Sequence, residues 1–165
     1  GLPVPVRTPT AREAGLALAG ALGALVLATG LSVLLAALDL VPGSVIEESG
    51  RIDPNFFLGV AVLSVLIVAP AEEYLFRGVI QGRLRESFGP VGAVVGSSLL
   101  FGSVHLTNYT GSVPQVAAGV LLIAGTGAVL GALYEWTDNL TVPIITHAVY
   151  NVVLAGTAYV TATAA

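Results

Sequence analysis

The sequence has no cysteine, no lysine and no methionine among its 165 residues. The absence of cysteine excludes disulfide bonds, thiolate zinc sites and a cysteine nucleophile. Arginine is the only cation, and six arginines against ten acidic residues give a formal net charge of −4. Since nucleic-acid binding depends on clustered lysine and arginine, this balance argues against a nucleic-acid partner. Because methionine is missing even at position 1, we expect a fragment, a processed form or a trimmed piece of a longer protein.

Charged residues are scarce: they make up 10% of the chain, against 55% hydrophobic residues and a mean hydropathy of +0.91. A soluble domain usually carries about 25% charged residues, which it needs to cover its surface. The composition therefore excludes an ordinary soluble domain, and it is far too apolar for a disordered chain. We predict an integral membrane protein in the plasma membrane of a prokaryote.

Long apolar runs predict how the chain crosses the bilayer, since a transmembrane helix needs about 20 mostly apolar residues. The fold class that we predict is all-α, a polytopic membrane helix bundle of about five transmembrane helices. Residues 1–55 would hold an N-terminal transmembrane helix and an acidic loop, and residues 56–160 would form the core. The five predicted spans are Ala14–Leu38, Phe56–Arg85, the stretch from Gly89-Pro90 to Leu106, Pro114–Tyr134 and Leu140–Tyr159.

The arginines predict the orientation of these spans. Arg7 and Arg12 precede the first span, and Arg83 and Arg85 end the second. Cytoplasmic loops are enriched in cationic residues, so both segments should lie in the cytoplasm. The loop between the first two spans holds four acidic residues and one arginine, and it should lie on the opposite side.

Glycine is abundant, with 20 residues, and several glycines are spaced one helical turn apart. Such steps let membrane helices approach closely, so that van der Waals packing joins them. We expect these steps to serve packing within one chain rather than dimerisation. They are Gly78-x3-Gly82, Gly92-x3-Gly96 and Gly127-x3-Gly131.

Six polar side chains interrupt the apolar spans, and both histidines of the chain are among them. A charge at the centre of a membrane helix costs about 2.5–3.5 kcal/mol on insertion scales, so it is rarely placed there without a function. The six residues are Glu72, Glu73, Arg77, His105, His147 and Asn151.

The spacing of these residues predicts how they face one another. Glu73 and Arg77 are four residues apart, so they can pair on one helical face. Glu72 points about 100° away from Glu73 and stays available. Two more pairs share a face in the same way: Phe101 with His105, and His147 with Asn151. The polar residues of the second, third and fifth spans lie at comparable depths in the bilayer. We therefore expect them to meet at one buried site.

The segments Glu72–Arg77, Phe101–His105 and His147–Asn151 match the motifs EExxxR, FxxxH and HxxxN in that order. With them the chain resembles the CAAX protease and bacteriocin-processing (CPBP, or abortive-infection) family of intramembrane endopeptidases, which includes the prenyl-protein endopeptidases. The resemblance covers about residues 58–156. It implies that residues 56–160 form a CPBP-like protease core.

The resemblance also implies a mechanism in which Glu72 and His105 hold and activate a water. His147 and Asn151 would stabilise the oxyanion, and Glu73, Arg77 and Phe101 would support the site. The substrate would be a membrane-associated or lipidated peptide.

No cofactor is favoured, because the helical zinc motif H-E-x-x-H is absent. A zinc-dependent version of the same protease stays open, with Glu72, His105 and His147 as ligands, since one Glu and two His can form an open zinc site.

Two other functions stay open. Intramembrane Glu and His often form proton relays, so a proton-coupled transporter is one alternative. The spans show no inverted repeat of the kind that many transporters carry. A non-catalytic membrane chaperone or immunity protein that retains the motifs is the other. The protease hypothesis requires that Glu72, His105 and His147 converge in a cavity that a peptide can enter.

Overall fold

The computed structural model describes residues 4–164, and it confirms the predicted all-α class. Four helical stretches are long and apolar enough to cross a membrane. Three of them are single helices, α1 (Ala11–Ala37), α6 (Val113–Thr137) and α7 (Thr141–Ala164). The fourth runs over Asn55–Val104. The chain is therefore an integral membrane protein by the length and composition of its helices.

The fourth stretch contains 50 residues, or about 75 Å of helix at 1.5 Å per residue. That is more than twice the thickness of a bilayer core, about 30 Å. The chain folds back at Gly89, whose φ of 67° and ψ of −179° suit glycine. Two crossings result, which makes five in all, as predicted. The elements of this stretch are α3 (Asn55–Leu63), η1 (Ser64–Val68), α4 (Ala69–Glu73), η2 (Tyr74–Gln81) and α5 (Gly82–Val104).

Short elements join the helices at the end of the bundle opposite Gly89. Part of the predicted acidic loop is a helix, α2 (Val45–Ile52), which begins where the Ser44 hydroxyl accepts a hydrogen bond from the Glu47 N–H at 3.2 Å. The strands β1 (Gly43–Ser44) and β2 (Tyr109–Thr110) pair antiparallel, and η3 (Leu106–Asn108) precedes β2.

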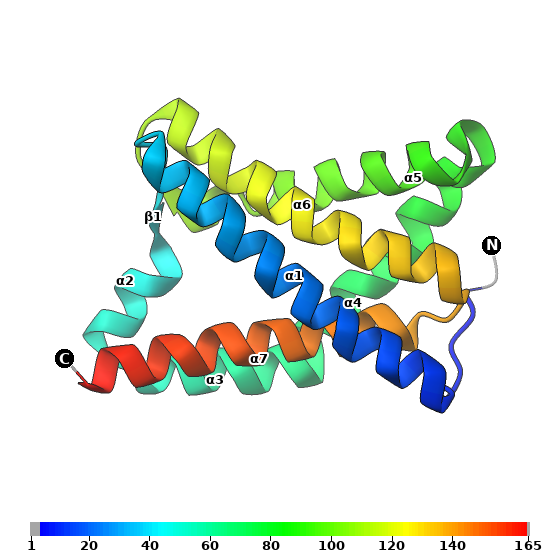
Figure 1. The fold of residues 1–165 in the computed structure, drawn as a ribbon, viewed down its shortest axis with the longest axis horizontal. Coiled ribbons are helices and arrows are strands. Elements are labelled where there is room, and N and C mark those ends of the chain that lie inside the picture. The colour runs from blue at the N-terminus through cyan, green and yellow to red at the C-terminus, as the bar shows by residue number, and fades with distance from the viewer. Residues whose placement is uncertain (1–3, 165) are drawn as a thin grey trace.

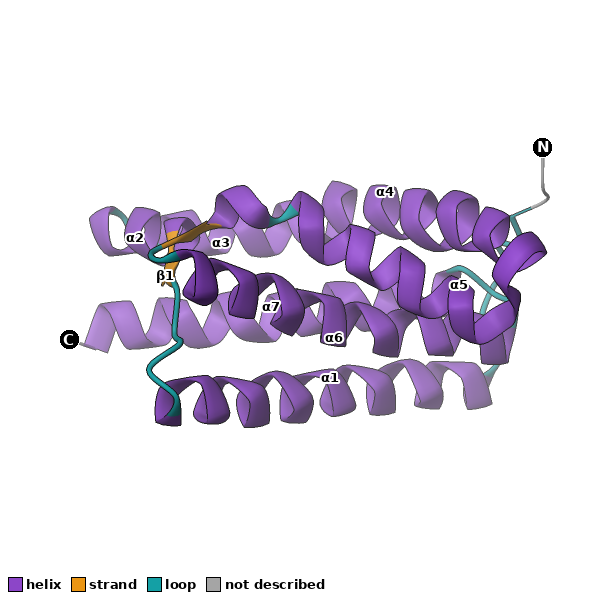
Figure 2. Cartoon of the chain, turned by 90° about the horizontal axis from the view of Figure 1, so that it is seen from above, coloured by secondary structure: helices purple, strands orange, loops and turns teal. Residues whose placement is uncertain are grey.

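The helices lie in three layers (Figures 1 and 2). Helix α1 covers one face, α6 and α7 lie in the middle, and the course from α3 to α5 covers the other face. The start of α1, the turn at Gly89 and the end of α6 lie at one end of the bundle, and α2 and β1 lie at the other. The four arginines near the termini of α1 and η2 therefore share one end, which agrees with the predicted sidedness.

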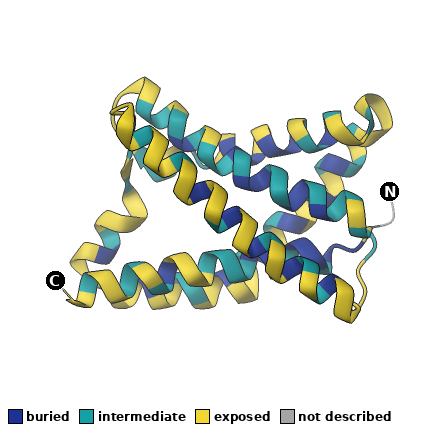
Figure 3. Cartoon of the chain, viewed as in Figure 1, coloured by how far each residue is buried: buried dark blue, intermediate teal, exposed yellow. Residues whose placement is uncertain are grey.

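The outward faces of the helices are largely exposed (Figure 3), and many of their exposed side chains are large and apolar. On α1 the buried face is a stripe of alanines, whereas Leu22, Val26 and Val33 are exposed. This arrangement suits a bilayer, because lipid accepts large apolar side chains while small residues let helices pack closely. The buried alanines of the stripe are Ala17, Ala21, Ala24 and Ala28.

The Gly127-x3-Gly131 step of α6 packs against side chains of α5 and η2. A Cβ atom on Gly127 would lie 3.0 Å from the Phe101 ring and 3.4 Å from Nη2 of Arg77. A Cβ atom on Gly131 would lie 2.8 Å from Oε1 of Gln81. The prediction that this step serves packing within the chain is confirmed.

Candidate active site

The helix that carries the two glutamates is irregular around them. Pro70 lies in the first turn of α4, which is only five residues long and is flanked by the π-helical segments η1 and η2. Proline removes a backbone N–H and clashes with the carbonyl four residues before it. A wider π-type turn relieves such a clash, and π-type turns concentrate at functional sites.

Glu73 and Arg77 form the predicted ion pair, with 3.1 Å between Oε2 and Nε, and both side chains are fully buried. Arg77 also donates from Nη2 to the Gly127 carbonyl oxygen at 2.8 Å, and its guanidinium lies 4.8 Å from the centre of the Phe101 ring. A buried charge is tolerated only when it is paired in this way. A Cβ atom at position 127 would lie 3.4 Å from Nη2 of Arg77, so the guanidinium packs directly against the α6 backbone here.

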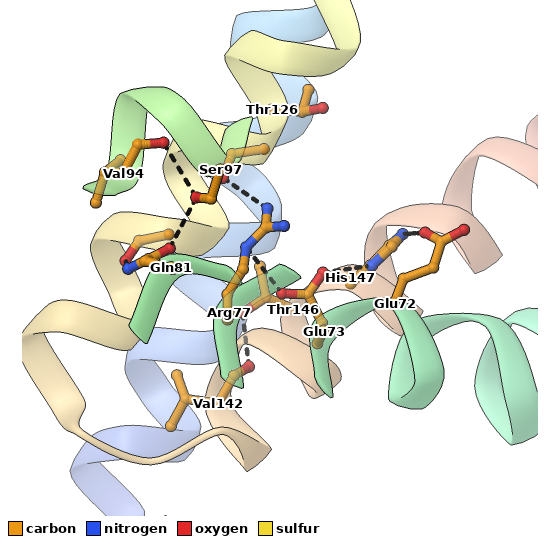
Figure 4. A network of polar contacts seen from close by, with 12 residues as sticks. Glu72, Glu73, Arg77, Gln81, Val94, Ser97, Thr126, Val142, Thr146 and His147 are labelled. Carbon is orange, nitrogen blue, oxygen red and sulfur yellow. Dashed lines mark hydrogen bonds and ion pairs between the residues drawn. The ribbon is translucent and has the colours of Figure 1, made fainter. Parts of the chain in front are cut away.

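The second oxygen of Glu73 receives a hydrogen bond from His147 (Figure 4). The distance between Nδ1 of His147 and Oε1 of Glu73 is 2.8 Å, and both side chains are buried. A carboxylate that already pairs with Arg77 is an acceptor, so Nδ1 of His147 carries the proton. The other ring nitrogen, Nε2, faces Glu72 at 3.9 Å from Oε2.

His105 is oriented in a similar way by its own helix. Its Nδ1 lies 2.7 Å from the carbonyl oxygen of Phe101, which can only accept, so this nitrogen also carries the proton. Nε2 of His105 then faces Oε1 of Glu72 at 3.8 Å. The Phe101 ring packs against both imidazoles, with ring centres 4.8 Å from His105 and 5.8 Å from His147. Phe101 thus borders both histidines, as its predicted supporting role requires.

Glu72 therefore lies between two ring nitrogens that have no proton when the rings are neutral. Distances of 3.8 and 3.9 Å are too long for direct hydrogen bonds. Within residues 4–164, Oε2 of Glu72 is buried and has no hydrogen-bond partner. Three acceptors that face one another need a donor, which a bridging water or one additional proton can supply. The site is accessible, since the Glu72 side chain is 27% exposed and that of His105 is 18% exposed.

Glu72, His105 and His147 thus lie close together, as the motifs predict. That they form a catalytic site which a peptide can enter stays a prediction. Asn151 lies one turn beyond His147 on α7, and its Nδ2 donates to Oγ of Ser64 in η1 at 3.4 Å. No hydrogen bond among the described residues joins Asn151 to Glu72. Its predicted part in oxyanion stabilisation stays a prediction.

Sequence reasoning missed a buried glutamine next to this site. Gln81 is fully buried, and its Nε2 donates to the Gly131 carbonyl oxygen and to Oε1 of Glu135, both at 3.0 Å. Its Oε1 accepts from the Ser97 hydroxyl at 3.2 Å. The signal was available, because Gln81 follows Arg77 by four residues, as Arg77 follows Glu73. Gln81 continues the same polar face and ties η2 to α5 and α6.

A catalytic zinc ion needs three protein ligands close enough to coordinate it together. The two Nε2 atoms and the Glu72 carboxylate are suitable ligand types, and Glu73 holds His147 as a carboxylate often holds a zinc-bound histidine. Across residues 4–164, however, no group of three or more His, Cys, Asp or Glu side chains stands close enough together to hold a metal ion. The side chains as they stand do not fit a bound zinc.

Comparisons with known proteins agree with the motifs. The family model described as type II CAAX prenyl endopeptidase Rce1-like matches residues 54–153, which include all the site residues above. The uncharacterized protein YpbD of Bacillus subtilis (strain 168) is 32% identical over 96 residues, which cover 57% of this chain and 43% of YpbD. The chain therefore spans less than half the length of that relative. No solved structure matches the chain.

Proposed function

Because the chain belongs to the Rce1-like family of type II CAAX prenyl endopeptidases, we propose that it is an intramembrane endopeptidase. Its substrate is a membrane-associated or lipidated peptide, and its nucleophile is a water activated by Glu72 and His105. The observation that carries the proposal is the Glu72 carboxylate, which faces Nε2 of both histidines at 3.8 and 3.9 Å inside the bundle. The bacterial relative supports a prokaryotic plasma membrane as its location.

Hydrolysis proceeds through proton transfer by Glu72. A water beside Glu72 and His105 attacks the carbonyl carbon of the peptide bond while its proton moves to the Glu72 carboxylate. The electron pair of the carbonyl double bond moves to the oxygen and forms an oxyanion. When the C–N bond breaks, the protonated Glu72 gives its proton to the leaving amine, which restores the carboxylate. The products are a carboxylic acid and an amine.

His147 and Asn151 stabilise the oxyanion. The Glu72 and Glu73 carboxylates and the Arg77 guanidinium together carry one negative charge. One further proton therefore makes the site neutral. On His147 this proton is on Nε2, because Nδ1 is already bonded to Glu73. Nε2–H then points toward the space beside Glu72, where the negative charge develops. Asn151 supplies the second donor once its long 3.4 Å bond to Ser64 is released.

Glu73 and Arg77 act through His147. Arg77 keeps Glu73 available as an acceptor, and Glu73 fixes which nitrogen of His147 carries the ring proton. Glu73 is therefore a positioning residue, which does not need to contact the substrate.

The test is a cleavage assay with the full chain in detergent or lipid nanodiscs. A panel of prenylated and unprenylated peptides is incubated with the wild type, Glu72→Gln and His105→Gln. Glu86→Gln is the matched control, since Glu86 is exposed and, within residues 4–164, forms an ion pair only with Arg83 at 3.0 Å. Wild type and Glu86→Gln should cleave a peptide, whereas both site variants should be inactive with unchanged thermal unfolding. Cleavage by Glu72→Gln at the wild-type rate would refute the proposal.

A further inference from the structure

The N-terminal residues, although outside the matched segment 54–153, contact the start of α7. The first N–H groups of a helix have no partner within the helix. Here the N–H of Leu140 donates to the carbonyl oxygen of Pro5 at 2.9 Å. Oδ1 of Asn139 accepts from the N–H of Thr141 and from that of Arg7, both at 3.2 Å. Residues 4–10, called here the N-terminal segment, thus help to cap α7.

The N-terminal segment is itself held by α1 and α6. Nη2 of Arg7 donates to the Thr137 carbonyl oxygen at 3.1 Å, and Nη1 donates to Oε2 of Glu13 in the first turn of α1 at 2.8 Å. The hydrogen bond to Glu13 raises the pKa of Arg7, so its charge persists at any physiological pH. The cap of α7 is therefore fixed relative to both α1 and α6.

A second contact joins α1 and α7 one residue before His147. The hydroxyl of Thr146 lies 3.0 Å from the Ala17 carbonyl oxygen of α1 and 3.0 Å from the Val142 carbonyl oxygen of its own helix. Thr146 and Ala17 are both fully buried. Close by, a Cβ atom on Gly20 would lie 2.5 Å from a Leu133 methyl group, so the α1 backbone is close to its neighbours here.

From these contacts we infer that residues 4–37 are a positioning element of the catalytic site, with Thr146 as the residue through which they act on His147. The cap fixes α7 along its axis, and the hydrogen bond from Thr146 to Ala17 fixes its rotation. Each residue of a helix turns by about 100°. The rotation of Thr146 therefore sets the direction in which His147 points toward Glu73. This inference rests on the proposed function, because it explains how His147 is held in place to stabilise the oxyanion.

The experiment uses the fact that the chain contains only two histidines. Imidazole ¹⁵N spectra of the labelled full chain then show two rings, and His105→Gln assigns them. Thr146→Val is compared with Thr157→Val, a matched control on the same helix. The Thr157 hydroxyl also bonds a carbonyl four residues back, that of Val153 at 2.8 Å, but it is exposed, and no hydrogen bond among the described residues joins it to another helix.

We expect Thr146→Val to weaken or abolish the signal of the His147 Nδ1 proton that is bonded to Glu73. Its kcat should fall about tenfold with KM within about twofold, since a small misplacement of a catalytic group acts on the chemical step. Thr157→Val should leave the signal and both constants unchanged. Thr146→Ser, which keeps the hydroxyl, should restore them.

A second pair of variants lies at the end of the bundle, in case Thr146→Val fails to fold. Arg7→Ala removes the bond to Thr137, and Arg12→Ala is its control, because no hydrogen bond or ion pair of Arg12 occurs among the described residues. Arg7→Ala should shift the His147 signal in the same direction as Thr146→Val, and Arg12→Ala should leave it in place.

The inference is overturned if Thr146→Val and Arg7→Ala lower only the unfolding temperature and leave the His147 signal and kcat as in their controls. Failure of the proposed function looks different. If the wild type shows the His147 Nδ1 signal and cleaves no peptide, the proposed function fails. The effect of Thr146→Val and Arg7→Ala on that signal still tests whether residues 4–37 position His147.

Discussion

At the scale of single residues, two adjacent glutamates have different environments. Both oxygens of Glu73 have partners, Arg77 and His147, and its side chain is fully buried. Glu72 is partly exposed, and its oxygens lie 3.8 and 3.9 Å from Nε2 of His105 and His147, too far for hydrogen bonds. Spacing along one helix predicted the Glu73–Arg77 pair. It did not predict the Glu73–His147 bond, because that partner lies 74 residues away and is placed by helix packing.

These environments predict opposite effects for the two amide substitutions. Glu73→Gln leaves the buried Arg77 without a counter-ion, which should cost about 3–5 kcal/mol of stability. Glu72→Gln should abolish turnover and change stability by less than about 1 kcal/mol, as is usual away from buried pairs. Unfolding in detergent and peptide cleavage measure the two effects. If Glu72→Gln kept its activity and Glu73→Gln lost only activity, the two roles would have to be exchanged.

Chelation separates a glutamate-activated water from zinc chemistry. With Glu72 as the base, activity should survive exhaustive chelation and show a bell-shaped pH profile. His147→Ala and Asn151→Ala should each lower kcat by about 10²–10³, the usual effect of losing an oxyanion donor. In a zinc enzyme activity would disappear with chelator and return with metal. Stoichiometric zinc that follows activity would make Glu72, His105 and His147 the ligands.

At the scale of elements, hydropathy predicted the five crossings and the turn at Gly89, because a bilayer demands long apolar helices and Gly89-Pro90 interrupts one. The π-helical segments η1 and η2 were not predicted, since hydropathy does not report hydrogen-bond register. Helix α2 was missed although its signals are present. Ser44 precedes it, Glu47 and Glu48 lie in its first turn and Arg51 in its last.

The packing of α6 gives a prediction for two nearby glycines. In Gly127→Ala the new methyl would lie 3.0 Å from the Phe101 ring and 3.4 Å from Arg77, so the Phe101 ring or α6 must give way by a few tenths of an ångström. We expect a loss of about 1–3 kcal/mol, the usual cost of overpacking, together with reduced cleavage. Gly125→Ala is the control on the same helix, because its methyl would meet Leu31 at an ordinary 3.5 Å. Equal unfolding temperatures for the two variants would contradict the conclusion that α6 packs tightly at Gly127.

At the scale of the whole molecule, the charges differ between the two ends of the bundle. Four of the six arginines belong to the end with the Gly89 turn, and the acidic residues around α2 belong to the other. Which end faces the cytoplasm stays a prediction. So does a division of the chain into residues 1–55 and 56–160.

Labelling of single cysteines tests the orientation, since the chain has no cysteine of its own. Ser87→Cys and Asp53→Cys are both at exposed positions, one at each end. In intact cells a membrane-impermeant thiol reagent should label Asp53→Cys and spare Ser87→Cys, as the positive-inside rule requires. Permeabilised cells, in which both should react, are the control. The reverse pattern would invert the topology.

The hydrogen bond between Thr146 and Ala17 joins residues 129 positions apart, and it has a consequence for biosynthesis. The ribosome makes the chain from its N-terminus, at about 5–20 residues per second. Helix α1, both glutamates and His105 are therefore synthesised before α7. His147 can reach Glu73 only after α7 has inserted and docked on α1. Under the proposed function, a nascent chain thus carries an incomplete catalytic site until α7 has docked on α1.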